Sequence, residues 1–176
     1  MRNIVLYIAM SLDGYIDDEA GGGAWLEGDG SAPDAPGSWP AFYEGVGDIL
    51  MGRATYQQVA TELAPGAWPY QGKRVWVFTH RPAPPHPGVS FTGQAPAALA
   101  AGLKARPGGD IWVCGGASLA GQLAGAGLID RYHISVIPAL LGRGVPLFPP
   151  GGAPAALRLV STRQYNGIVD LVYERR

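Results

Sequence analysis

Short apolar runs recur along this chain, and polar or glycine-rich segments separate them. The first run, Asn3–Met10 (NIVLYIAM), is apolar on both alternating faces, which is typical of a parallel strand that helices cover on both sides. Later runs of the same kind are shorter and end at glycine, proline or a polar pair. They predict further strands at residues 48–51, 75–78, 89–92, 111–114 and 132–137.

Helical segments are expected between several of these strands. Ser38 is a suitable N-cap, with Pro40 in the first turn, for a short helix that ends near Gly45. An alanine-rich segment favours another helix, which the Pro107-Gly108-Gly109 sequence would stop. Together the patterns predict helices at residues 38–45, 54–63, 95–105 and 117–125. Because strands and helices alternate, we expect the strands to form a parallel sheet.

The last part of the chain follows a different pattern. Leu157–Thr162 and Ile168–Glu174 predict two strands joined by a turn near Asn166-Gly167, with no helix before them. We therefore expect a three-layer α/β/α fold, with a central, mostly parallel mixed sheet of about eight strands and an antiparallel C-terminal hairpin. The chain has 176 residues and no repeat or linker, so we expect one domain spanning residues 1–176.

Charge and cysteine content narrow the functional class. The 13 basic and 14 acidic residues give a formal charge of −1, without the basic excess of a nucleic-acid-binding protein. Cys114 is the only cysteine, which excludes an internal disulfide and a CxxC metal clamp. No stretch approaches the roughly 20 apolar residues of a membrane span, and the N-terminus has no signal-peptide layout. We expect a cytoplasmic protein that binds a small molecule, with no nucleic acid, membrane or metal as partner.

Three predicted strand ends share one design. Met51-Gly52-Arg53, Thr79-His80-Arg81 and Cys114-Gly115-Gly116 each follow an apolar strand, and the first and third open a helix. The carboxyl ends of parallel strands meet at one edge of a sheet, where ligands bind. Helix N-termini and arginine side chains favour phosphate there, and glycine lets the backbone approach a ligand closely. Together the three ends predict a dinucleotide site.

Other polar residues allow two interpretations each. The segment Ser11–Ser38 is too long and too polar for a simple connection, which is typical of a lid or binding loop. Within it, Asp13 either caps the turn at Gly14 or takes part in catalysis. Glu44 either lies in solvent at a helix end or relays a proton. His133 lies in an apolar strand and is expected to be a hydrogen-bonded core residue rather than a base.

Several segments, in this order, resemble the dihydrofolate-reductase-like superfamily, specifically the group shared with the C-terminal reductase domain of riboflavin-biosynthesis deaminase-reductases. They are SLDGYID (11–17), DILMGRATY (48–56), VWVFTHRP (75–82), DIWVCGGASLAGQL (110–123), LIDRYHISVIPALLGRGVPLF (128–148) and the closing VDLVYERR. The resemblance covers nearly the whole chain. Its specificity comes from the order and spacing of the segments, since any one of them alone is a weak match.

The resemblance implies an NADPH site. Ala9 matches the first-strand position whose backbone holds the nicotinamide carboxamide, and the loop from Leu12 to about Asp34 matches the mobile loop that closes over the nicotinamide. The positions that match the phosphate-binding motifs are Gly52, Arg53 and Thr55 after one strand, Thr79, His80 and Arg81 at the end of another, and Gly115, Gly116, Ala117, Ser118 and Leu119 at the glycine turn. The second group matches the family's site for the adenosine 2′-phosphate, which favours NADPH over NADH.

The substrate side departs from the family pattern. Dihydrofolate reductases place a carboxylate on the first helix, but here that helix reads SWPAFYEG, with Glu44 as its only acid and no basic residue for a phosphoribosyl group. Cys114 stands where the riboflavin group often has an acid, whereas Asp13 matches an acid that lies near that group's substrate. We predict Asp13 and Glu44 as catalytic residues. The predicted substrate contacts are Trp25, Phe42 and Tyr56.

These observations predict an NADPH-dependent oxidoreductase that transfers a hydride to a small conjugated heterocycle of the pteridine or pyrimidine kind, and that is not a true dihydrofolate reductase. Two alternatives stay open. One is a 5-amino-6-(5-phosphoribosylamino)uracil-type reductase of riboflavin biosynthesis, and the other is an NADP-binding protein without turnover. The resemblance further implies a homodimer.

Overall fold

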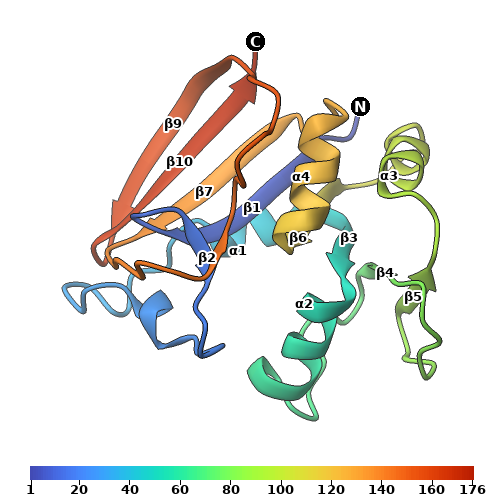
Figure 1. The fold of residues 1–176 in the computed structure, drawn as a ribbon, viewed down its shortest axis with the longest axis horizontal. Coiled ribbons are helices and arrows are strands. Elements are labelled where there is room, and N and C mark those ends of the chain that lie inside the picture. The colour runs from blue at the N-terminus through green and yellow to red at the C-terminus, as the bar shows by residue number, and fades with distance from the viewer.

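The computed structural model describes all residues, 1–176, and is built around an eight-stranded sheet (Figure 1). The strand order is β5-β4-β3-β6-β1-β7-β10-β9. Every pair from β5 to β7 is parallel, whereas β10 is antiparallel to both β7 and β9. The bounds are β1 Ile4–Ser11, β3 Val46–Gly52, β4 Arg74–Phe78, β5 Val89–Thr92, β6 Asp110–Gly115, β7 Arg131–Ile137, β9 Leu157–Tyr165 and β10 Ile168–Arg175. The predicted fold class is confirmed.

Helices cover both faces of this sheet. In Figure 1, α4 lies in front of the strands and α1 lies behind them. The front helices α3 and α4 bury leucines such as Leu103 and Leu123 against Leu6 and Leu50 of the strands. On the other face, aromatic residues of α1 pack against a second group of strand residues. The bounds are α1 Trp39–Glu44, α2 Arg53–Gln58, α3 Pro96–Lys104 and α4 Ala117–Gly125, with a 3-10 turn η1 at Ala24–Glu27 and a π-helical turn η2 at Val59–Leu63 that continues α2. No helix is long and apolar enough to cross a membrane.

The local predictions agree with the structure at the ends of most elements. Ser38 occupies the N-cap position of α1, as predicted, although its side chain makes no capping hydrogen bond. Asn166 and Gly167 both have positive φ, 49° and 72°, so this pair makes the tight turn of the β9–β10 hairpin. The sequence analysis missed a small second sheet, in which β2 (Tyr15–Asp17) pairs with β8 (Val145–Pro146). Strands of two or three residues are too short for a hydrophobic alternation to reveal them.

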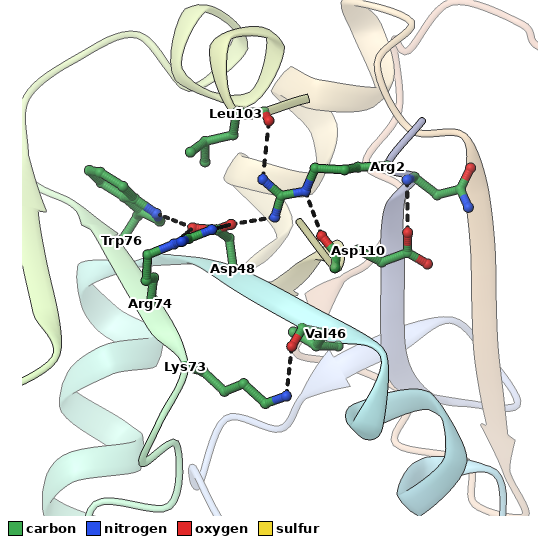
Figure 2. A network of polar contacts seen from close by, with 10 residues as sticks. Arg2, Val46, Asp48, Lys73, Arg74, Trp76, Leu103 and Asp110 are labelled. Atoms are coloured by element: carbon green, nitrogen blue, oxygen red, sulfur yellow. Dashed lines mark hydrogen bonds and ion pairs between the residues drawn. The ribbon is translucent and has the colours of Figure 1, made fainter. Parts of the chain in front are cut away.

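A buried ion network lies at the end of the sheet where the parallel strands begin (Figure 2). Asp48 of β3 is fully buried, and its carboxylate accepts hydrogen bonds from Arg2, Arg74 and the Trp76 indole. Arg2 also donates to the carbonyl oxygens of Leu103 and Gly109. The network therefore joins β1, β3, β4 and the segment before β6, on the edge opposite to the strand ends discussed next.

Candidate active site

A cleft of about 930 Å³ opens at the carboxyl ends of β1, β3, β4 and β6. Parallel strands place their ends on a common edge, and this is the edge where α/β proteins bind ligands. The loop after β1 closes one side of the cleft, and α2 with η2 closes another. The predicted cofactor residues that line the cleft are Ala9, Gly52, Arg53, Thr55, Thr79, His80, Gly115, Gly116, Ala117, Ser118 and Leu119. The structure thus gathers, from four separate parts of the chain, all but one of the predicted cofactor positions.

The glycine turn after β6 leaves room beside its backbone. Gly115 has φ 138°, a conformation that side chains disfavour, and it leads into α4 through Gly116, the N-cap of that helix. A Cβ on Gly116 would lie 3.6 Å from Thr55 Oγ1 and would occupy part of the cleft. No side chain caps α4, so its first amide groups are free to bind an anion. This arrangement fits the diphosphate of a dinucleotide.

Arg53 supplies positive charge beside this turn. It begins α2, and its guanidinium donates hydrogen bonds to Thr79 Oγ1 at 3.2 Å and to the carbonyl oxygens of Arg81 and Pro82 at 3.4 and 3.3 Å. These contacts hold the guanidinium against the end of β4 while it still lines the cleft. His80 lines the cleft as well. Arg81 is exposed and lies outside the lining, and only its backbone takes part in the contacts around Arg53.

The long loop after β1 contributes to the cleft through residues that the sequence analysis did not single out. Ile16, Asp17 and Leu26 line it, whereas Trp25 next to Leu26 does not. Asn166, at the tip of the β9–β10 hairpin, donates to the carbonyl of Glu27 at 2.7 Å and accepts from the amides of two other loop residues. The hairpin therefore fixes this part of the loop, next to the cleft residue Leu26.

Asp13 and Glu44, the two predicted catalytic acids, both lie outside the lining of this cleft. The Asp13 carboxylate accepts hydrogen bonds from Ser11 Oγ at 2.6 Å and from the amides of Leu141 and Gly142 at 3.1 and 2.7 Å. These bonds, that from Ser11 foremost, hold the pKa of Asp13 below its usual range. The observed contacts therefore favour the structural interpretation, although Asp13 fastens the segment after β7 rather than only its own turn. Glu44 is exposed at the end of α1.

The predicted substrate aromatics Phe42 and Tyr56 pack inside the protein. Phe42 lies 4.6 Å from Tyr7 between ring centroids, within an aromatic group beneath α1. Tyr56 does not line the cleft, and its ring centroid lies 5.2 Å from that of Phe91. Trp112, which the sequence analysis treated only as part of a strand, lines the cleft beside Cys114. Side-chain direction within an aromatic-rich core depends on packing partners that sequence spacing does not reveal.

Known proteins resemble this chain over nearly its whole length. The sequence model of the RibD C-terminal domain matches residues 2–170. The chain belongs to the RibD C-terminal domain family. A relative in Bacillus subtilis (strain 168), the uncharacterised protein YwjB, is 39% identical over 99% of this chain and 98% of its own length.

Solved structures of RibD-like proteins share the fold. A putative riboflavin biosynthesis protein from Shewanella sp. PV-4 has a TM-score of 0.84 and 29% identity, covering 100% of this chain and 99% of that chain. A diaminohydroxyphosphoribosylaminopyrimidine deaminase/5-amino-6-(5-phosphoribosylamino)uracil reductase from Thermotoga maritima has a TM-score of 0.71 and 16% identity, covering 99% of this chain and 57% of that one. The resemblance found in the sequence is confirmed, because the chain belongs to the RibD C-terminal domain family and shares the fold of these proteins.

In this RibD-like chain, α2 and η2 contribute further residues to the cleft, which the sequence did not reveal. Gln58, Glu62 and Leu63 of α2 and η2 line the cleft, as do Asp17 and Leu26 of the loop. Gln58 and Glu62 are four residues apart, the spacing that places two side chains on one face of a helix. That spacing was readable in the sequence, but a polar helix face is ordinarily a solvent face, and only the structure shows that this one lines the cleft.

A buried polar group lies beside the cleft on β7 and β10. Ser135 pairs with the cleft residue Ala9 across β1 and β7, and its hydroxyl donates to Asp170 Oδ1 at 2.5 Å. His133 is buried, as predicted, and its Nε2 lies 3.5 Å from Asp170 Oδ2, but this nitrogen lacks the predicted hydrogen bond. Burial alone would raise the pKa of Asp170, but the contacts with His133, Ser135 and Ser38 outweigh it and lower the pKa.

Cys114 has little nucleophilic character in this setting. Burial raises the pKa of its thiol to about 12, and the Tyr70 hydroxyl lies 4.0 Å from the sulfur. A thiol with so high a pKa is protonated at neutral pH, and the thiolate is the reactive form. The side chain therefore contributes apolar surface to the cleft, where it is half-buried and not fully buried as predicted.

Proposed function

We propose that this protein is an NADPH-dependent reductase that transfers a hydride to a small conjugated heterocycle. The observation that supports this most is the convergence of the Gly115-Gly116 turn, the free start of α4 and Arg53 at one cleft. Two independent helix starts and one guanidinium converge there, and such groups stabilise a chain of phosphates.

The residues in the cleft fit a nicotinamide dinucleotide. The diphosphate would lie against the amides of Ala117 and Ser118, with Arg53 beside it. The adenosine phosphate would lie toward Thr79 and His80 at the end of β4. The nicotinamide would lie over the end of β1, at Ala9, and when bound it would supply the hydride.

This chain's own groups would position the substrate and exclude water. Leu26 of the loop and Leu63 of η2 supply apolar surface to the cleft lining. The hairpin contacts of Asn166 fix the loop beside Leu26, which would limit water at the reacting atoms. Asp13 serves this arrangement indirectly, because its carboxylate fixes the turn after β1 to the segment after β7.

An NADP-binding protein without turnover is the second candidate. It is favoured by one observation, namely that neither of the predicted proton donors, Asp13 and Glu44, lines the cleft. The two candidates make the same prediction for cofactor binding and opposite predictions for NADPH oxidation with a heterocyclic acceptor. The homodimer and the cytoplasmic location stay predictions.

Cofactor titration tests the phosphate site. NADPH should raise the melting temperature and quench the fluorescence of Trp112, which lines the cleft. Arg53→Ala should weaken NADPH binding by about 1.5–3 kcal/mol, the range for hydrogen bonds to charged groups. Arg106→Ala is the matched control, because Arg106 is exposed and lies outside the cleft. Unchanged affinity in Arg53→Ala, or no binding of NADPH at all, would refute the proposed site.

Arg81→Ala tests the preference for NADPH. If the exposed Arg81 side chain reaches the 2′-phosphate when the cofactor binds, the variant should lose NADPH affinity by about 1–3 kcal/mol and keep its NADH affinity. Equal losses for the two cofactors would show that Arg81 does not distinguish them.

A further inference from the structure

The charged side chains of the cleft lining are two carboxylates and one guanidinium. Arg53 is the only lysine or arginine in the lining, and it lies against Thr79, next to His80, at the proposed cofactor site. The carboxylates are those of Asp17 and Glu62, and Glu62 lies nine residues after Arg53 along α2 and η2. The lining away from Arg53 therefore has negative formal charge and lacks a permanent cation.

Arg143, two residues before the strand partner of Asp17, does not compensate for these carboxylates. Arg143 is 77% exposed and forms an ion pair with Glu19 at 3.2 Å. Arg143 does not line the cleft, although its neighbour Val145 does. The first helix, α1, has no lysine or arginine that could reach over from the other side.

A substrate phosphate would be poorly bound in these surroundings. Proteins hold phosphates with arginine or lysine side chains, free amides at helix starts, or both. Here these groups are gathered at the cofactor end, where the dinucleotide would use them. A second phosphate near Glu62 would meet like charge, with no lysine or arginine of the lining beside it.

We infer that the substrate is an unphosphorylated planar heterocycle, neutral or cationic, and that Glu62 excludes phosphorylated analogues from the cleft. This inference rests on the proposed function, since it assumes that the cofactor occupies the end with Arg53. It separates this chain from a reductase that acts on a phosphoribosyl compound.

Binding of matched compound pairs tests the inference. The full chain saturated with NADP⁺, which permits no turnover, is titrated calorimetrically with 5-amino-6-(5-phosphoribosylamino)uracil and its dephosphorylated riboside, and with FMN and riboflavin. In each pair that binds, the unphosphorylated member should bind at least about tenfold more tightly, a difference of about 1.4 kcal/mol. Equal or tighter binding of the phosphorylated members would overturn the inference.

Glu62→Gln identifies the residue responsible. The variant should bind the phosphorylated members about three- to tenfold more tightly than the unmodified chain does, with little change for the unphosphorylated members. Asp34→Asn is the matched control, because it removes one exposed carboxylate of the loop outside the cleft lining. An equal gain in Asp34→Asn, or no gain in Glu62→Gln, would show that Glu62 does not select.

The remaining outcomes separate this inference from the proposed function. If NADP⁺ binds but no heterocycle does, the inferred substrate class is wrong, while the cofactor site stands. If NADP⁺ and NADPH both fail to bind, the proposed function fails and the inference fails with it.

Discussion

Replacement of Asp48 by asparagine should destabilise the fold severely without touching the cleft. Asp48 is fully buried, and Arg2, whose side chain is 2% exposed, loses its ionic partner in this variant. Removing one member of a buried ion pair costs about 3–5 kcal/mol, because the other charge stays buried and unpaired. For a chain of this length, about 2–4 °C is lost per kcal/mol, so the melting temperature should fall by roughly 6–20 °C.

Arg74→Ala provides the matched control for this prediction. Arg74 binds the same carboxylate at 2.7 Å, but its side chain is 62% exposed. Water replaces the lost contacts at such a site, so the cost should stay below about 1 kcal/mol. Both variants are measured by urea denaturation at pH 7. A loss below about 1 kcal/mol in Asp48→Asn, or equal losses in the two variants, would refute the argument from burial.

The same network predicts how stability depends on pH. Burial alone would raise the pKa of Asp48, but the hydrogen bonds from Arg74, Trp76 and Arg2 outweigh it and place the pKa far below the usual value of 3.8. A carboxyl whose folded-state pKa is depressed contributes stability above its unfolded pKa and loses it as the pH falls. The unmodified chain should therefore lose stability between about pH 5 and pH 2, and Asp48→Asn should show a shallower loss over that range.

Two further predictions concern the cleft. Gly115→Ala should destabilise the fold by about 1–3 kcal/mol and weaken NADPH binding, because alanine is strained at φ 138°. The control is Gly121→Ala, inside α4 with open space around it, which should be neutral or stabilising by up to about 1 kcal/mol. Thermal denaturation compares the two variants, and an equal effect would contradict the backbone argument. Cys114 should react with iodoacetamide at pH 8 at least about a hundredfold more slowly than glutathione, because its pKa is about 12. Mass spectrometry measures the labelling of the folded chain and of the chain in urea. Fast labelling of the folded chain would refute the prediction.

The sequence by itself determined the order of the main strands and helices and the edge at which the cofactor residues meet. Runs such as Asn3–Met10 are apolar on both faces, and a parallel strand between helices is the structure that buries both. The glycine turn at Gly115-Gly116 and the positive-φ pair Asn166-Gly167 were equally readable, because their local conformation depends on residue type.

Only the tertiary structure decided which polar side chains became partners. Asp13 meets the amides of Leu141 and Gly142, well over a hundred residues away in the chain, and Glu62 lines a cleft to which the loop residues Asp17 and Leu26 also contribute. Hydrophobic periodicity determines which face of an element is buried, but a carboxylate can be satisfied by any donor that the fold brings near. The cofactor edge was therefore predictable from local sequence, whereas the substrate end depended on contacts between distant segments.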